Sequence, residues 1–336
     1  MSPHFRRQIV GVVSMLLIFN AAAWLWAIAT FRHQPVLLGT ALLAYTFGLR
    51  HAVDADHIAA IDNVTRKLLQ EKRCPLAVGW YFSAGHSMIV IAMSVGVAVA
   101  TSNIQSRFAA LKAMGAVISP LISAFFLLAL AIANLLTLKS VVASFRALRL
   151  GEVLNDDDID VLLNQRGFLA RIFRPVFALV SKSWHLYPIG FLFGLSFDTA
   201  TEVALFGISA NQASHGTSVW SILVLPVLFA AGMSLVDTAD GILMTGAYRW
   251  ALTNPLRKLY YNMSITLASV VVAVTIGSVE LLGLVSSRFG WSGAMWDIVG
   301  ELNDHFSVLG YWIISLFFIS WIGSIVVYRI RAPDVR

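Results

Sequence analysis

The chain has 336 residues, of which 58% are hydrophobic and only 12% are charged. Soluble domains carry about 25% charged residues, so this composition excludes an ordinary soluble protein. The net charge of +6 does not indicate a nucleic-acid partner, because the basic residues lie between long apolar runs, as they do in membrane proteins. A single cysteine, Cys74, excludes an intrachain disulfide and a cysteine-rich zinc site.

Eight stretches are long and apolar enough to cross a bilayer, whose hydrocarbon core needs about 20 apolar residues per helix. The sequence therefore predicts an all-α, polytopic membrane protein that forms one integral membrane domain over residues 1–336. The expected spans are residues 9–31, 35–63, 77–101, 115–138, 185–209, 217–246, 260–285 and 307–329.

The distribution of Lys and Arg indicates the orientation. With a cytosolic N-terminus, 19 of the 24 basic residues fall on the inner side and 4 on the outer side, while Arg50 lies within a span. Short cytosolic loops of membrane proteins are enriched in Lys and Arg. We therefore expect a multi-pass protein with both termini in the cytosol and a long cytosolic loop at residues 139–184.

Two pairs of short strings indicate an internal repeat. Phe47-Gly48-Leu49 in the second expected span matches Phe193-Gly194-Leu195 in the fifth. Phe82-Ser83-Ala84-Gly85 in the third span matches Phe229-Ala230-Ala231-Gly232 in the sixth. Spans three apart run in opposite directions, so spans 1–3 and 4–6 would form an inverted repeat, with spans 7 and 8 appended. Carriers often bind their substrate between such halves.

The most unusual stretch is residues 50–58, which reads Arg-His-Ala-Val-Asp-Ala-Asp-His-Ile within the second expected span. Ionisable groups at membrane depth are rare and usually line a pathway or a site. Neutral imidazole combined with carboxylate is a ligand set that suits divalent nickel, cobalt or zinc. The stretch therefore indicates a metal-ion carrier.

Helical phase divides this motif. On an intact helix His51, Asp54 and His57 share one arc of about 120°, whereas Asp56 faces elsewhere. A break in the helix at Gly48 would allow Asp56 to join them. A ligating imidazole also needs an acceptor for its other ring nitrogen, a role open to several of the nearby carboxylates.

Three further polar clusters lie at membrane depth, in the third, fifth and sixth expected spans. At about 1.5 Å rise per residue in a core of about 30 Å, their positions allow them to meet the motif in one cavity. We expect the metal ligands to be His51, Asp54, Asp56, His57 and His86. We expect the pathway and the groups that orient these ligands to include Arg50, Asn63, Ser87, Asp198, Thr199, Glu202, Asp237 and Asp240. For Asp56 or Asp240 taken singly, a buried pair with Arg50 that locks two helices is an equal alternative.

Four strings of this sequence together resemble the signatures of the nickel/cobalt transporter family. They are RHAVDADHI at 50–58, FSAGHS at 82–87, FDTATE at 197–202 and LVDTADG at 235–241, in the family's order, and the likeness extends over essentially the whole chain. The sequence is most similar to the high-affinity nickel permeases of Gram-negative bacteria that supply hydrogenase and urease. The family's His-x4-Asp-His signature falls on His51, Asp56 and His57. The resemblance thus gives Asp56 a more important role than its position on an intact helix suggests. A distorted helix would remove this conflict.

The resemblance implies eight spans and import of Ni²⁺ or Co²⁺, as a transported substrate rather than a cofactor, across the bacterial cytoplasmic membrane. It also implies that the protein is not an enzyme and has no ATPase subunit, and the chain has no Gly-x4-Gly-Lys-Ser/Thr loop for phosphate. Val53 resembles the more nickel-restricted members. The residues leave open export of the same metals, or an intramembrane zinc enzyme, although the spacing is not His-Glu-x-x-His. They also leave open the coupling ion and the oligomeric state.

Overall fold

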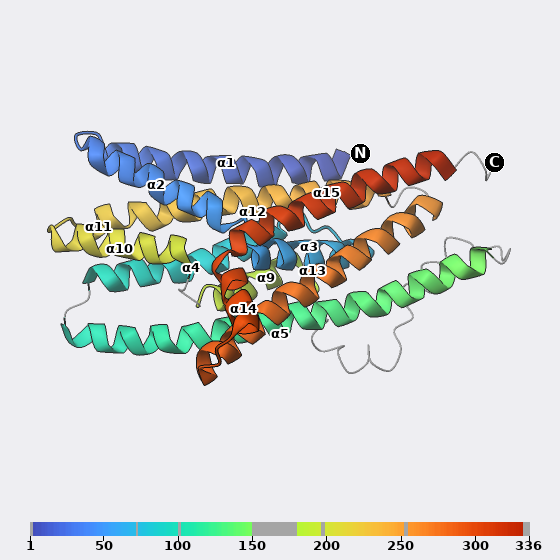
Figure 1. Ribbon diagram of the computed structural model, residues 1–336. Coiled ribbons are helices and arrows are strands. Elements are labelled where there is room, and N and C mark those ends of the chain that lie inside the picture. Colours follow the sequence, from blue (N-terminus) through green and yellow to red (C-terminus); the bar gives the residue numbers. More distant parts are fainter. Residues whose placement is uncertain are drawn as a thin grey trace.

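The computed structural model describes residues 3–71, 73–99, 102–149, 180–195, 199–251 and 255–331. Within these ranges the regular structure is helical, without a strand. The long helices lie roughly along one axis, and the start of α1 and the end of α15 lie toward the same end of the bundle (Figure 1). The all-helical prediction is confirmed.

The helices are labelled as in Figure 1. The first part of the chain forms α1 (Pro3–Phe31), α2 (Pro35–His51), α3 (Ala55–Gln70), α4 (Val78–Val99) and α5 (Ser102–Arg149). The second part forms η1 (Ser183–His185), α9 (Leu186–Phe193), α10 (Ala200–Ser214), α11 (Val219–Ile222), α12 (Val224–Ala251), α13 (Pro255–Phe289), α14 (Ala294–Asp304) and α15 (Phe306–Arg331).

Five stretches of the described helices have the length and hydropathy of a membrane span, and the bent pair α2–α3 makes a sixth if it is counted as one. The five are Phe5–Phe31, Val78–Val99, Met114–Leu136, Val219–Arg249 and Met263–Phe289. The fifth expected span is divided into the short helices α9 and α10, and α15 contains a shorter apolar segment, Val308–Phe317. The chain is therefore a helical membrane protein.

The second expected span is broken at residues 52–54 rather than at Gly48, which lies inside α2. Asp54 has extended backbone angles (φ −62°, ψ 145°), and α3 leaves α2 at a bend of 54°. The Asp54 side chain does not cap α3, because its Oδ2 instead lies 3.0 Å from Nδ1 of His51. Gly310 of α15 packs on the Val53 carbonyl, where a Cβ would collide, so α15 covers the broken backbone. Such cover is needed where backbone groups are not paired at membrane depth.

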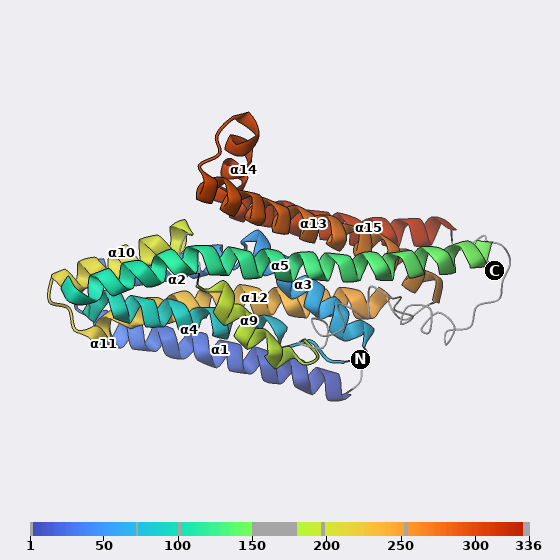
Figure 2. The ribbon, with the colours of Figure 1, turned by 90° about the horizontal axis from the view of Figure 1, so that it is seen from below.

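The remaining helices enclose this break. Figure 2 shows α13 and α15 side by side on one side of α5, with α1 on the other side of the bundle. The outward face of α1 exposes large apolar side chains, for example Ile18 at 68% and Leu25 at 67%. Exposed apolar faces of this kind suit contact with lipid, and the polar side chains are correspondingly gathered in the interior.

Candidate metal site

Four helices, α2, α3, α4 and α10, bring the chemically distinctive side chains together. His51 is the last residue of α2, His57 lies in the first turn of α3, His86 lies within α4 and Glu202 lies in the first turn of α10. All four are buried, with Glu202 and His57 at 0% exposure. Sites formed where helices are interrupted near the membrane midplane are typical of secondary transporters.

The ring nitrogens and one carboxylate oxygen lie close enough together that they could hold a single ion. His51, His57 and His86 each offer one ring nitrogen, and these atoms lie within 4.8 Å of one another. Nε2 of His86 lies 3.0 Å from Nε2 of His51 and 3.0 Å from Oε1 of Glu202, and the latter is 3.9 Å from Nε2 of His51. Ligands at right angles lie about 3 Å apart when each is about 2.1 Å from a metal. A single proton on His86 Nε2 cannot serve both neighbours, whereas one metal ion can.

Asp54 and Thr201 hold the other side of the His51 ring. Oδ2 of Asp54 lies 3.0 Å from Nδ1, and Oγ1 of Thr201 lies 3.4 Å from the same atom. When Nδ1–H donates to the carboxylate, the lone pair is on Nε2, the atom that faces His86 and Glu202. In this arrangement Asp54 would orient His51, and Glu202 could hold a metal ion together with the two imidazoles.

His57 is held in a similar way from the opposite half of the protein. Its Nδ1 lies 3.4 Å from Oδ1 of Asp237 on α12, and its ring packs edge-on against Phe82. Among the described residues its Nε2 has no hydrogen-bond partner, and the same is true of Oδ2 of Asp237. A buried, unpartnered ring nitrogen is costly unless a ligand satisfies it.

The two helices that begin at the site each carry an acid in their first turn, Asp56 in α3 and Glu202 in α10. The N-terminal end of a helix carries a partial positive charge, which would repel a metal cation, and these carboxylates offset it. Asp56 is half-buried, and in the described structure it forms no ion pair with any of the three imidazoles. The structure thus does not place Asp56 among the clustered ligand atoms.

The other predicted site residues have different surroundings. Asp198 lies outside the described residues. Arg50 is exposed, and no described carboxylate lies within ion-pair distance of it. Neither Asp56 nor Asp240 therefore forms the helix-locking pair with Arg50. Thr199 donates to Oε2 of Glu202 at 2.8 Å. Ser87 is buried, Asp240 is half-buried, and Asn63 accepts a hydrogen bond at 3.5 Å from Arg66, which belongs to a separate network.

This separate network was not predicted. Both carboxylate oxygens of Asp62 are used, by the Tyr248 hydroxyl at 2.6 Å and the Ser269 hydroxyl at 2.9 Å. Arg66 is buried and donates to Thr266 at 2.8 Å, although its charge was assigned to the cytosolic side. The charged residues in and next to the second expected span were visible in the sequence. Their tyrosine and serine partners on α12 and α13 could not be predicted, because single hydroxyl residues in apolar helices are not distinctive.

These features define a class of protein: a helical membrane protein with a buried cluster of imidazole and carboxylate side chains that could hold a metal ion. The sequence pattern of the high-affinity nickel-transport protein family (NicO) matches residues 37–327. The chain belongs to this family, which consists of transport proteins rather than enzymes.

Individual relatives cover nearly the whole chain. It is 54% identical over 329 residues to the high-affinity nickel transport protein of Cupriavidus necator, covering 98% of this chain and 94% of that protein. It is 49% identical to the hydrogenase nickel incorporation protein HupN of Bradyrhizobium diazoefficiens (94% and 82% covered). It is 34% identical to the cobalt transport protein NhlF of Rhodococcus rhodochrous (96% and 92% covered). No solved structure is a significant match.

Proposed function

We propose that this protein is a high-affinity permease that imports Ni²⁺, and to a lesser degree Co²⁺, across the bacterial cytoplasmic membrane to supply enzymes such as hydrogenase or urease. The observation that carries the proposal is the buried group of His51, His57 and His86, whose ring nitrogens lie within 4.8 Å of one another next to Glu202. The names of the relatives, two for nickel and one for cobalt, support the choice of metal.

Within this proposal the ion is held by His51, His86 and Glu202, and His57 is the ligand toward the α12 side. Asp54 orients His51 and Asp237 orients His57, because each carboxylate faces the Nδ1 atom of its ring. Imidazole nitrogen with one carboxylate favours nickel and cobalt over magnesium or calcium, which prefer all-oxygen sites. Asp56 acts through the start of α3.

We further propose that the eight expected spans are present, with the bent pair α2–α3 as span 2, the short helices α9 and α10 together as span 5, and α15 as span 8. The inverted repeat is supported by helix packing. The matched glycines lie near the C-terminal ends of α2 and α9: Gly48 is three residues before the end of α2 at His51, and Gly194 directly follows the end of α9 at Phe193. Gly48 packs on the Phe229 backbone of α12, and Gly194 packs on the His86 backbone of α4. Span 2 thus pairs with span 6, and span 5 pairs with span 3, as a two-fold exchange of halves requires.

The orientation follows from the excess of basic residues on one side, which puts both termini in the cytosol. The start of α1 and the end of α15 lie toward the same end of the bundle, as this orientation requires (Figure 1). The membrane potential contributes about 2.3 kcal/mol per charge per 100 mV, and about twice that for a dication moving inward. The potential thus favours import by a secondary carrier without an ATPase subunit.

The proposal is tested by uptake of radioactive nickel in cells that lack their own nickel importers. Cells express wild type or His51→Ala at equal membrane abundance, with and without excess cobalt. We expect saturable uptake by wild type, its loss in His51→Ala, and weaker competition by cobalt than by unlabelled nickel. No accumulation by wild type, or a lowered nickel content of the cells, would refute import; the latter would indicate export.

A further inference from the structure

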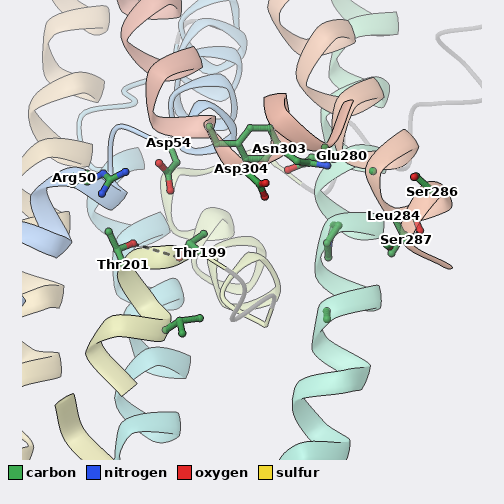
Figure 3. A pocket seen from close by; sticks show the side chains of 16 residues that line it. Arg50, Asp54, Thr199, Thr201, Glu280, Leu284, Ser286, Ser287, Asn303 and Asp304 are labelled. Carbon is green, nitrogen blue, oxygen red and sulfur yellow. Dashed lines mark hydrogen bonds between the residues drawn. The ribbon is translucent and has the colours of Figure 1, made fainter. Parts of the chain in front are cut away.

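A cavity of about 710 Å³ lies beside the metal site and was not expected from the sequence. We call it the outer chamber. Its walls come from α5, α13, α14 and the start of α10, and Arg50 and Asp54 from the broken second span also line it (Figure 3). In the orientation proposed above, the residues that follow Glu280 in α13, together with α14, belong to the outer side of the membrane.

The side of the chamber nearest the metal site consists of residues that contact the metal site directly. Asp54 lies 3.0 Å from Nδ1 of His51, and Thr201 lies 3.4 Å from the same atom. Thr199 donates to Glu202 at 2.8 Å. One layer of side chains therefore separates the chamber from two of the proposed ligands, and every member of that layer is polar (Figure 3).

The chamber is large enough for a hydrated ion, whereas the metal site is not. An ion with about six waters occupies roughly 200 Å³, since a water takes about 30 Å³ in the liquid. The chamber has room for such an ion with its water shell. The ligand nitrogens, within 4.8 Å of one another, leave no room for a water shell.

The charges of the lining favour a cation. The chamber is lined by three carboxyl groups, Asp54, Glu280 and Asp304, and by one guanidinium, Arg50. Glu280 is 6% exposed and lines the chamber, and its Oε1 accepts a hydrogen bond from Ser123 at 2.9 Å. Low-dielectric walls of one charge sign concentrate counter-ions and raise their rate of association.

We propose that the outer chamber is the access route by which the hydrated metal ion reaches the site from outside, that Glu280 raises the local cation concentration there, and that the ion exchanges water for ligands in passing Asp54. This inference rests on the proposed function and adds the route to it. Outside the chamber, exposed helix faces offer apolar side chains instead, for example Ile18 of α1 at 68% exposure.

The first test uses the single cysteine of the chain. In a Cys74→Ser background, Ser287→Cys places a thiol in the chamber and Ser214→Cys places an exposed thiol at the end of α10, away from it. A membrane-impermeant, positively charged thiol reagent is applied from outside. We expect labelling at both positions. Nickel uptake should fall below about a tenth only for Ser287→Cys, because a bulky cation then stands in the route.

The second test separates the charge of Glu280 from its structural contact. Glu280→Gln removes the charge, whereas Ser123→Ala removes the hydrogen bond and keeps the charge. We expect Glu280→Gln to raise the KM for nickel about three- to tenfold with little change in maximal rate, and to weaken the dependence of KM on ionic strength. Ser123→Ala should leave the KM for nickel and its dependence on ionic strength unchanged.

The outcomes are distinguishable from failure of the proposed function, which would appear as absence of uptake by wild type. If wild type takes up nickel but labelled Ser287→Cys transports normally, the chamber is not the route. If Ser123→Ala reproduces the effect of Glu280→Gln, the carboxylate acts through packing and the assigned role of its charge is wrong.

Discussion

Asp54→Asn is the most informative single change, because the structure and the family signature assign different importance to the two acids of the motif. Asp54 faces Nδ1 of His51 at 3.0 Å, whereas Asp56 forms no ion pair with the described imidazoles. Removing the partner of a metal-bound histidine typically lowers metal affinity 10- to 100-fold. This range corresponds to about 1.4–2.8 kcal/mol.

The geometry places Asp54→Asn near the lower limit of that range. An asparagine Oδ1 can still accept the Nδ1–H of His51, and Thr201 remains 3.4 Å from the same nitrogen. The charge is lost but the tautomer is kept, so we expect the KM for nickel to rise about tenfold. Asp54→Ala removes both the charge and the hydrogen-bond acceptor, and should raise the KM for nickel nearly a hundredfold. The start of α3 should be unaffected, because the Asp54 side chain does not cap it.

The assay is the initial rate of nickel uptake against nickel concentration, at equal membrane abundance of each variant. Asp56→Asn is the matched comparison: the same chemical change two residues further along, with a smaller effect expected. If Asp54→Asn leaves KM within about threefold of wild type, the orienting role worked out here is refuted. If Asp56→Asn is the more damaging, Asp56 takes a direct part that the His-x4-Asp-His signature implies and this geometry does not show.

Two further predictions concern the scaffold. Gly48→Ala should sharply reduce membrane abundance and thermal stability in detergent, because the new Cβ would overlap the Phe229 carbonyl. Gly39→Ala is the control and should be harmless, because nothing lies within 4 Å of the position of its Cβ. Equal behaviour of the two variants would contradict the close approach of α2 and α12. Tyr248→Phe removes the 2.6 Å hydrogen bond to buried Asp62 and should lower the free energy of unfolding by about 0.6–2 kcal/mol. An unchanged thermal midpoint for Tyr248→Phe would show that this bond does not stabilise the fold.

Much of the site could be predicted because its elements are local in the chain. Two histidines and two aspartates within seven residues of an apolar run have few explanations other than a site, and His86 is the only histidine of the third expected span. The structure brings these three histidines together. For the acid oriented toward the ligand atoms, the sequence supported two different predictions: helical phase favoured Asp54, and the family signature favoured Asp56. Which of the two is oriented so depends on the break at residues 52–54, which sets the direction of α3 and hence of Asp56.

Glu202 shows the same limit from the other half of the chain. It was assigned to the pathway, and the structure places its Oε1 3.0 Å from His86. With equal offset along the chain, Gly48 corresponds to Gly194 and Asp56 corresponds to Glu202, so the repeat alone would have given both acids one role. The equivalence is lost at the site, because the first half supplies three imidazoles and the second half supplies none in the described residues.

What the sequence by itself determined is therefore the class of the protein: a helical membrane protein, its family, and a metal-binding motif within its second span. These follow from hydropathy, from charge distribution and from residue types that lipid tolerates only for a function. The tertiary structure alone decided which atoms meet, that Arg50 faces a chamber instead of an acid, and that Asp62 is enclosed by hydroxyl groups. Such contacts join residues more than 100 positions apart, and they depend on helix breaks and glycine contacts that no local pattern specifies.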